Sequence, residues 1–288
     1  MANVVITGSN SGFGRLTAET LAKVGHTVFA TMRGSAGKNS KAAAELKAFG
    51  AANGNRVHVV ELDVTSDASV QQAIDQIAKQ TGGVIDVLFN NAGRFSMGIQ
   101  EAFSVDEVKS LFEINVFGPL RVNRTALPHM RKRRSGLIIT TSSIAGRISM
   151  PCFGTYAASK HAVEALADAQ RDELKELGID VVLLEPGAYP TPVGDKGLYT
   201  SDARADEYGT IAELPRQVGK GLGELFTSPN APKPQDVADA VAKLIATPAG
   251  QRPDRVVVDN LTGGPIRAVN EAHVTQRRAL MAAFGMSV

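Results

Sequence analysis

Length, composition and charge restrict the class of protein first. The 288 residues are 43% hydrophobic and 21% charged, enough for one large buried core, and a net charge of +2 does not favour nucleic acid or an anionic membrane surface as partner. The single cysteine, Cys152, excludes an internal disulfide framework, and no apolar run approaches the roughly 20 residues of a membrane-spanning helix. We therefore expect one domain over residues 1–288, a cytoplasmic location, and small molecules and copies of the chain as partners.

Short apolar runs alternate along the chain with longer segments of helical periodicity. Runs rich in Val, Ile and Leu predict strands at residues 4–6, 27–30, 57–62, 85–89, 137–140, 179–184 and 256–258. Apolar residues spaced by three and four predict helices that include residues 15–24, 68–80, 105–115, 119–131 and 157–177. Because continuously apolar strands are buried on both faces, this order predicts an α/β fold, a doubly wound parallel sheet in a Rossmann-like three-layer α/β/α arrangement.

One stretch departs from this alternation. Residues 188–232 hold several Pro and Gly residues and show weak helical periodicity. Connections longer than about 15 residues in compact domains are commonly lids or binding loops. We expect a small substrate-binding lobe here, within the single domain.

A glycine-rich turn lies between the first strand and the first helix. It comprises Gly8, Ser9, Asn10, Ser11, Gly12, Phe13 and Gly14. At this position free backbone N–H groups and the helix dipole attract a pyrophosphate, and glycine permits positive φ and a close approach of the backbone. The spacing Gly-x-x-x-Gly-x-Gly differs from the Gly-x-Gly-x-x-Gly dinucleotide pattern, and glycines also gather in ordinary turns. The flanking strand and helix favour a dinucleotide site.

The end of the second strand indicates which dinucleotide is bound. An NAD site commonly places a carboxylate about 20 residues beyond the glycines. Here the sequence reads Ala30-Thr31-Met32-Arg33, without a neighbouring carboxylate, and a guanidinium pairs well with a 2′-phosphate. NADP(H) is therefore favoured, with NAD(H) as the alternative; otherwise Arg33 is a solvated loop cation.

Tyr156 and Lys160 are the first candidates for catalysis. Their i,i+4 spacing places phenol and ammonium on one helix face, although any helix can carry this pair on a solvated face. A nearby positive charge favours phenolate, so we expect the pKa of Tyr156 to fall from about 10 and the phenol to act as a general acid or base. Ser143 follows the strand at 137–140, at the sheet edge where α/β folds bind ligands.

Taken in order, these motifs resemble the short-chain dehydrogenase/reductase family, in its classical subgroup. The matching motifs are the glycine turn, Asn90-Asn91-Ala92-Gly93, Asn115, Ser143, Tyr156 with Lys160, and Pro186-Gly187-Ala188-Tyr189-Pro190-Thr191. The resemblance covers roughly residues 1–195. It implies a nicotinamide-dependent oxidoreductase that acts on a carbonyl or secondary alcohol.

The resemblance also implies the roles of the catalytic residues. Tyr156 would protonate the carbonyl oxygen or deprotonate the alcohol, and Ser143 would hydrogen-bond to that oxygen. Lys160 would lower the pKa of Tyr156 and bind the nicotinamide ribose, and Asn115 would complete a proton relay through water. Two alternatives stay open: Ser143 as a turn cap, and Asn115 as a residue that bends its helix beside Gly118 and Pro119.

Further cofactor contacts follow from the same resemblance. They are Asn90, Ala92 and Gly93 beneath the riboses, Asp63 and Val64 at the adenine, and Pro186, Gly187 and Thr191 at the nicotinamide. The residues alone leave other interpretations open for three of these features. Asn90 to Gly93 would also suit an ordinary turn, Asp63 a helix cap, and Thr191 a loop between prolines.

Three hypotheses for the function follow. The first is an NADP-preferring oxidoreductase whose substrate meets Phe95, Met97, Met150, Phe153 and Tyr189, residues that are otherwise core. The alternatives are a catalytically silent, cofactor-sensing regulatory protein and an epimerase or dehydratase of the extended subgroup. Helices 119–131 and 157–177 resemble those by which family members pair, so we expect a homodimer or homotetramer. The five histidines are scattered, so we expect no metal.

Overall fold

Seven parallel strands form the central sheet in the residues that this computed structural model describes, 1–200 and 202–286. In spatial order they are β3 (Val57–Glu61), β2 (Thr27–Met32), β1 (Asn3–Ile6), β4 (Val87–Asn90), β6 (Gly136–Thr141), β7 (Ile179–Pro186) and β9 (Arg255–Val258). Val4 of β1 pairs with Val28 of β2 on one side and with Val87 of β4 on the other. The strand order changes direction between β1 and β4, and doubly wound sheets bind ligands at the carboxyl edge beside such a reversal.

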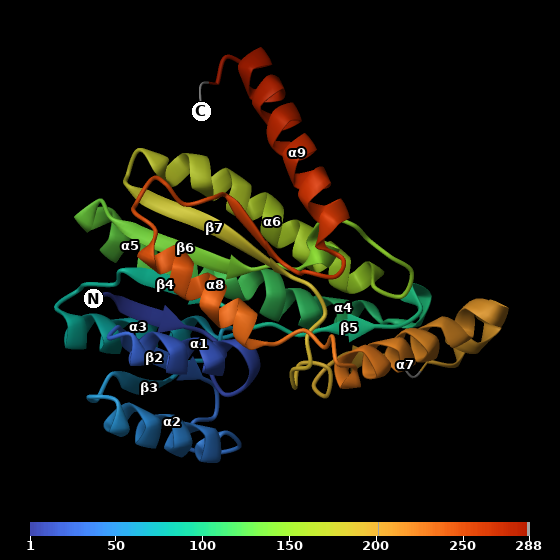
Figure 1. Cartoon of the computed structure of the whole chain (residues 1–288), viewed down its shortest axis with the longest axis horizontal. Coiled ribbons are helices and arrows are strands. Elements are labelled where there is room, and N and C mark those ends of the chain that lie inside the picture. Colours follow the sequence, from blue (N-terminus) through green and yellow to red (C-terminus); the bar gives the residue numbers. More distant parts are fainter. Residues whose placement is uncertain (201, 287–288) are drawn as a thin grey trace.

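Helices cover both faces of the sheet (Figure 1). On one face lie α1 (Gly12–Lys23), α2 (Ser40–Ala52) and α8 (Gln235–Ala246). On the other lie α3 (Asp67–Thr81), α5 (Gly118–Arg133) and α6 (Gly154–Lys175). Val4 and Ile6 pack with the first set and Val5 with the second, as the alternation of side chains along a strand requires. The expected doubly wound α/β fold is confirmed.

The expected strands all form, and some expected boundaries move. β2 and β7 run on to Met32 and Pro186, which carries both strands farther toward the ligand-binding edge. Outside the segment 188–232, three helices, α2, α8 and α9 (Gly263–Ala283), are not among those expected. α2 is rich in alanine, and α9 buries only Gly263 and Ile266, so both lack a strong apolar stripe. Figure 1 shows α9 extending away from the sheet toward the C-terminus.

The helix expected at 105–115 is divided in the structure. α4 (Val105–Phe112) continues into a π-helical turn, η2 (Glu113–Phe117), which leads directly into α5. Such wider turns inside helices are frequent at functional sites, and this one holds Asn115. In the described part of the chain, no helix combines the length and the apolar character that a membrane span requires.

The segment 188–232, expected as a lobe, holds more regular structure than its sequence suggests. β8 (Leu198–Tyr199) pairs in parallel with β5 (Ser96–Met97), and η4 (Ala203–Glu213) and α7 (Leu214–Thr227) follow. In Figure 1, α7 projects away from the sheet. The expectation of weak periodicity is wrong for α7, because Leu214, Val218 and Leu222 recur every four residues. Glycines at 219, 221 and 223 lie among these residues and mask the pattern.

Two short helical turns complete the described structure near the ligand-binding edge. η1 (Gln100–Ala102) follows β5, and η3 (Ile144–Gly146) follows β6. Ser143 is the N-cap residue of η3, so the chain turns sharply just after it leaves the sheet. This turn places Ser143 opposite the start of α6.

Candidate active site

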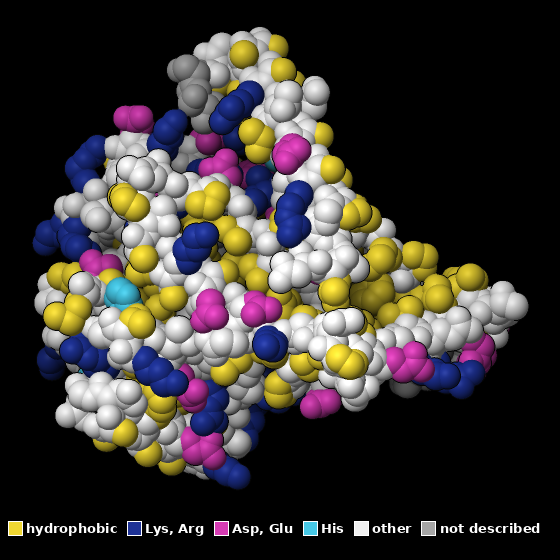
Figure 2. Space-filling model, in the orientation of Figure 1, with side chains coloured by type: hydrophobic (Ala, Val, Ile, Leu, Met, Phe, Trp, Pro, Cys, Tyr) yellow, Lys and Arg dark blue, Asp and Glu magenta, His cyan; other side chains and the backbone are white. Residues whose placement is uncertain are grey.

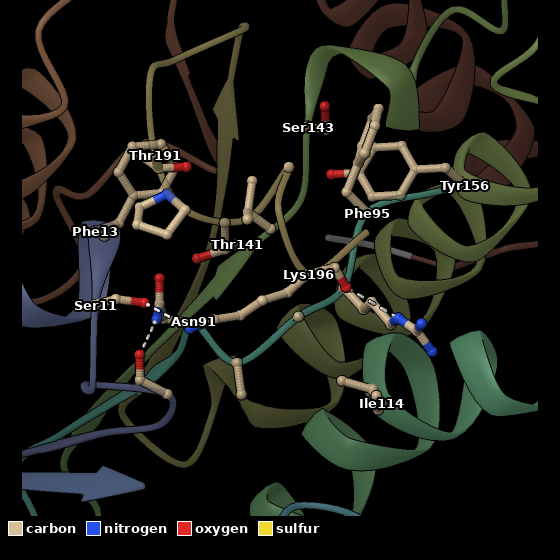
Figure 3. Close-up of a pocket in the computed structure, with 18 of the residues that line it drawn as sticks. Ser11, Phe13, Asn91, Phe95, Ile114, Thr141, Ser143, Tyr156, Thr191 and Lys196 are labelled. Carbon is tan, nitrogen blue, oxygen red and sulfur yellow. Dashed lines mark hydrogen bonds between the residues drawn. The ribbon is translucent and has the colours of Figure 1, made fainter. Parts of the chain in front are cut away.

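A cavity of about 1160 Å³ opens at the carboxyl edge of the sheet. Its lining comes from the glycine turn, the segments that follow β2, β3, β4, β6 and β7, the start of α6, and the lobe. Figure 3 shows Ser143 and Tyr156 on one side of this space, and Ser11, Phe13 and Thr191 on the other. The fold therefore brings the expected cofactor residues and the expected catalytic residues into one site.

The glycine turn has a backbone geometry that favours glycine. Gly8 and Gly12 lie in the left-handed region, with φ of 69° and 56°. A Cβ on Gly14 would lie 2.5 Å from the Gly8 carbonyl oxygen and 2.5 Å from Asn91 Nδ2. Ser11 is the N-cap residue of α1, but its side chain makes no capping hydrogen bond. The first N–H groups of α1 are therefore available to an anion.

The residues of the turn divide into those that line the cavity and those that support the turn from behind. The lining residues are Gly8, Asn10, Ser11, Gly12 and Phe13. Ser9 is fully buried, and its hydroxyl donates to the Ile6 carbonyl at 3.0 Å. Gly14 leaves room for the Asn91 amide. Ser9 and Gly14 are therefore placed to shape the turn rather than to touch a ligand.

Arg33 and Lys38 line the end of the cavity beyond β2. No carboxylate follows Arg33 closely in the sequence, but folding brings Glu61 of β3 to this loop. The Glu61 carboxylate accepts hydrogen bonds from the N–H groups of Gly34, at 2.6 Å, and Ser35, at 2.7 Å. Glu61 therefore holds the loop in place, and cations line the cavity there. Sequence reasoning missed Lys38, because nothing in the local pattern distinguishes it from a solvated lysine.

Asp63 and Val64 line the same end of the cavity. Burial raises the pKa of Asp63, but hydrogen bonds from Thr65 and the charges of Arg33 and Lys38 outweigh it, so the pKa is lowered. Asp63 Oδ1 accepts from the Thr65 N–H at 3.0 Å and from its hydroxyl at 2.8 Å. The helix-cap alternative for Asp63 is wrong, because Ser66 caps α3.

Tyr156, Ser143 and Lys160 converge at the other end of the cavity. Tyr156 and Lys160 lie one turn apart on α6, and Lys160 Nζ is 5.7 Å from the centre of the Tyr156 ring. The same ammonium donates to the Thr141 carbonyl at 2.8 Å. Ser143 lies beside the Tyr156 phenol in Figure 3, and its hydroxyl acts to lower the pKa of that phenol.

The neighbouring residues Ser142 and Ser143 have different hydrogen-bond partners. The Ser142 hydroxyl donates to Glu164 Oε1 at 2.6 Å, so it is engaged within the protein. The Ser143 hydroxyl accepts from the Ala145 N–H at 3.2 Å, which is the turn-cap interaction given above as the alternative. Because Ser143 makes this contact and also meets the phenol, the two interpretations of Ser143 are compatible.

Desolvation sets the proton affinities of Tyr156 and Lys160. It raises the pKa of Tyr156 to about 12, and the hydrogen bond with Ser143 offsets only part of this. Burial lowers the pKa of Lys160 to about 8, although the Glu164 carboxylate opposes the fall. The expected fall in the Tyr156 pKa is therefore wrong for this structure, because desolvation dominates. A phenol with this pKa keeps its proton at neutral pH, which is the form that a general acid needs.

Asn115 is held by its own side chain just outside the cavity lining. Its Oδ1 accepts from the Arg94 N–H at 2.8 Å, and its Nδ2 donates to the Arg94 carbonyl at 2.9 Å and to Ser159 Oγ at 3.0 Å. The side chain is only 2% exposed. Asn115 therefore ties the loop after β4 to α6 beside Lys160, and its π-helical turn agrees with the helix-bending alternative.

The motif Asn90 to Gly93 is brought to the cavity only in part. Asn90 Nδ2 donates to Asn123 Oδ1 on α5 at 2.7 Å, so this side chain points away from the cavity. Its neighbour Asn91 lines the cavity and donates to the carbonyls of Thr7, at 2.9 Å, and Gly8, at 3.1 Å. Ala92 and Gly93 also line the cavity.

The segment after β7 closes the cavity on the lobe side. Pro186, Gly187 and Thr191 line it. Lys196 reaches back from the lobe, with its Nζ 3.5 Å from Ser11 Oγ (Figure 3), and its carbonyl accepts from Arg94 Nε at 3.2 Å. Lys196 thus adds a positive charge over the glycine turn. Sequence reasoning missed Lys196 and Arg94, which are brought together only by the fold.

Apolar side chains line the cavity beside the phenol. The Phe95 ring centre lies 5.2 Å from that of Tyr156 and 5.8 Å from that of Phe153. Met150 and Tyr189 also line the space, whereas Met97 is buried in β5 behind it. Of the apolar residues expected at the pocket, Met97 therefore belongs to the core, and the others form part of the cavity wall.

The sheet order, the glycine turn and the joined cavity define a dinucleotide-binding α/β protein. A family model described as short chain dehydrogenase matches residues 2–198. The chain belongs to the short-chain dehydrogenase/reductase family of oxidoreductases, as the motifs indicate.

Two relatives cover most of this chain. A 3-ketodihydrosphingosine reductase from Bacteroides thetaiotaomicron is 33% identical over 88% of this chain and 94% of its own length. An NADPH-dependent 3-dehydrocapnine reductase from Ornithobacterium rhinotracheale is 34% identical over 76% of this chain and 77% of its own length.

Solved structures resemble the whole fold. A short-chain dehydrogenase from Streptomyces avermitilis is similar with a TM-score of 0.76 and 29% identity, over 99% of this chain and 97% of that one. A family member from Burkholderia phymatum in complex with NAD gives 0.75 and 26%, over 96% and 95%. An actinorhodin polyketide ketoreductase with NADPH gives 0.74 and 26%, over 91% and 96%. Nicotinamide dinucleotides of both kinds therefore bind to chains of this fold.

Proposed function

We propose that this chain is an NADP-preferring oxidoreductase that transfers a hydride between nicotinamide and a ketone or secondary alcohol, with Tyr156 as general acid and base. The observation that carries the proposal is the Tyr156 phenol beside the Ser143 hydroxyl in the cavity wall, with the Lys160 ammonium 5.7 Å from its ring. These two hydroxyl groups lie close enough together to hydrogen-bond to the same substrate oxygen.

The residues present fit a nicotinamide dinucleotide. The uncapped N-terminus of α1, the close-packed Gly14 and the Lys196 ammonium together offer N–H groups and positive charge to a pyrophosphate. Ala92, Gly93 and Thr191 line the path from there to Tyr156. The bound cofactor supplies or accepts the hydride.

The proton is handled by the chain itself. In reduction, Tyr156 Oη donates its proton to the substrate oxygen while Ser143 Oγ donates a hydrogen bond to the same oxygen. The Lys160 ammonium then stabilises the phenolate that remains. In oxidation the same groups act in reverse, but a phenol with a pKa of about 12 must first lose its proton. The high pKa of the phenol therefore favours the reducing direction at neutral pH, which is also the direction of the two related reductases.

The preference for NADP rests on the charges at the adenosine end. Arg33 and Lys38 both line the cavity there, and their charges act on Asp63 beside them. Among the described residues, Glu61 is the only carboxylate that hydrogen-bonds to the loop after β2. Its partners there are Gly34 and Ser35. A 2′-phosphate would therefore meet two cations, whereas an unphosphorylated ribose would leave them unpaired.

The experiment that tests the function is a panel of ketones, aldehydes and alcohols with NADPH and NADH, for the wild type and Tyr156→Phe. We expect the variant to lose turnover by about 10²- to 10⁴-fold, the typical contribution of a general acid, and to keep its affinity for NADPH. Tyr208→Phe, an exposed tyrosine of the lobe, is the matched control and keeps full activity. Equal rates in wild type and Tyr156→Phe would refute the mechanism.

The alternative of a silent cofactor sensor makes the opposite prediction. A sensor would bind NADPH without turnover of any compound in the panel. The complete set of Ser143, Tyr156 and Lys160 around one point favours chemistry instead. The epimerase or dehydratase alternative predicts products that retain the oxidation state of the substrate.

We also propose a homodimer or homotetramer that pairs through α5 and α6. Leu120 of α5 is 38% exposed and Leu166 of α6 is 44% exposed, and Phe117 beside α5 is 45% exposed. Large apolar side chains on adjacent helices favour contact with a second copy. A monomeric mass by light scattering would contradict the pairing. The cytoplasmic location stays a prediction that fractionation of cells would test.

A further inference from the structure

The outer wall of the cavity is a helix whose apolar side is only half-buried. In α7, Leu214, Val218, Leu222, Leu225 and Phe226 fall on one stripe, at spacings of three and four residues. No residue of this helix, described over its full length 214–227, is buried. A helix with such a stripe normally packs it against the core.

The stripe of α7 faces the cavity instead. Val218, Leu222 and Phe226 line the cavity, so each contributes apolar surface to the space beside the catalytic residues. Figure 2 shows hydrophobic side chains gathered where α7 meets the body, around a hollow.

The charged side chains of α7 turn the other way. Lys220 and Glu224 are 79% and 69% exposed and lie 3.8 Å apart, and Arg216 pairs with Glu213 at the start of the helix. None of these four charged residues lines the cavity. The surface that α7 presents to the cavity is therefore apolar, and its polar surface faces solvent.

The opposite wall is apolar as far as the phenol. The Phe95 ring contacts Tyr156, Phe153 and Tyr199, with centres 5.2, 5.8 and 6.3 Å away. Met150 lines the cavity and is 46% exposed. Apolar side chains thus line the same cavity both beside the reacting position and at α7, and the space between them is called the channel below.

We infer that the substrate is a ketone or secondary alcohol on an extended hydrocarbon chain, which lies between the α7 stripe and the Phe95 wall. The inference rests on the proposed function, since it places the oxygen at Tyr156 and Ser143. From Val218 to Phe226 the stripe is about 12 Å long at about 1.5 Å per residue, which matches a chain of roughly ten methylene groups. The hydrocarbon chain covers the apolar surface of the stripe that the protein leaves exposed.

A series of methyl ketones from 2-butanone to 2-dodecanone, reduced with NADPH, tests the inference. Each added methylene that becomes buried raises kcat/KM by roughly threefold to fourfold, until the chain outgrows the channel. Leu222→Ser removes the centre of the stripe, so we expect it to lower kcat/KM for 2-decanone at least tenfold and leave that for 2-butanone unchanged. Lys220→Ser, on the outer face of the same helix, is the matched control and changes neither.

Two results would overturn the inference. One is a kcat/KM that is independent of chain length, or an equal loss for both ketones in Leu222→Ser. The other is a lower molecular mass of Leu222→Ser by light scattering without any effect of chain length, which would assign the stripe to a second copy of the chain.

A binding measurement separates this inference from the proposed function. Absence of turnover with every ketone would refute the proposed function. Calorimetric titration of the NADP-loaded protein with 2-dodecanone then decides the inference by itself. Binding that weakens at least tenfold in Leu222→Ser, but not in Lys220→Ser, supports the hydrocarbon channel, and undetectable or equal binding in all three proteins refutes it.

Discussion

The α/β body and the lobe are built on different principles, although both line the same cavity. In the body, helices such as α3 and α6 bury a stripe against the sheet, and candidate catalytic side chains such as Lys160 are buried and hydrogen-bonded to the sheet. In the lobe, η4 and α7 bury no residue, and the stripe of α7 faces the cavity. The core thus holds the side chains on the body side of the cavity in place, whereas the lobe offers an apolar surface to a ligand in the cavity.

This difference predicts where substitutions act. A change in the body at the cavity disturbs groups that the core holds in place, and so affects cofactor binding, chemistry or stability. An equivalent change in the lobe alters the choice of substrate or has little effect. Pairs of matched substitutions, one in each region, test the distinction.

The largest effect is expected for a methyl group added to a glycine. Gly14→Ala places a Cβ 2.5 Å from the Gly8 carbonyl oxygen, so the turn must shift, and we expect NADPH affinity to fall about 100-fold, or about 2.7 kcal/mol. Gly223→Ala in α7 meets no atom within 4 Å and is expected to leave the affinity unchanged. Fluorescence titration measures both, with thermal unfolding as a check of folding. Equal affinities in the two variants would mean that the turn does not hold the pyrophosphate.

A smaller effect is expected from a buried carboxyl group. Glu185 of β7 is fully buried; burial and then the Glu164 charge raise its pKa from 4.5 to about 7. Its contribution to stability is therefore fully present below pH 4.5 and is lost as the pH rises through 7. Glu185→Gln cannot ionise, so relative to wild type its free energy of unfolding should rise by about 1–3 kcal/mol between about pH 4 and pH 8.

Urea unfolding at the two pH values measures this difference, and the lobe offers the control. The pKa of Asp202 is lowered to about 2 by its hydrogen bonds with Arg204, so this carboxylate stays charged throughout the range. Asp202→Asn should therefore show no such change with pH. If Glu185→Gln behaves like Asp202→Asn, the Glu185 carboxyl is ionised in the folded protein well below pH 7.

The smallest of these effects concerns cofactor choice. Arg33→Ser removes one charge-assisted hydrogen bond to a 2′-phosphate at an exposed position, so we expect the ratio of kcat/KM with NADPH to that with NADH to fall about tenfold. Arg204→Ser removes an exposed arginine of the lobe and should leave the ratio unchanged. Steady-state kinetics with both cofactors measures the ratio, and an unaltered ratio in Arg33→Ser would remove the basis for NADP preference.

Much of the body can be predicted from the sequence, because its signals are local. The apolar run Val4 to Ile6 followed by glycines predicts a strand and turn, and the i,i+4 spacing predicts that Tyr156 and Lys160 share a face. The orientation of the Asn90 side chain can also be predicted from the sequence. Leu88 and Asn90 are two residues apart on β4, so both point to the α5 face, and Asn91 was the better candidate for the cavity.

The remaining features depend on contacts between distant parts of the chain. Lys196 lies 185 residues from Ser11, and no local pattern links the two. The direction of the Tyr156 pKa shift cannot be predicted from the sequence either, because the i,i+4 spacing reveals the nearby charge but not the desolvation that outweighs it. The stripe of α7 was missed for a third reason, since glycines interleaved with apolar residues resemble a loop.

The pairing of β5 with β8 has a mechanical consequence. Only two residues of each strand form this contact, and it fixes the base of the lobe to the segment that directly follows Phe95. The Leu198 N–H also donates to the Phe95 carbonyl at 2.8 Å, so the same backbone contact that anchors the lobe holds the residue whose ring contacts Tyr156.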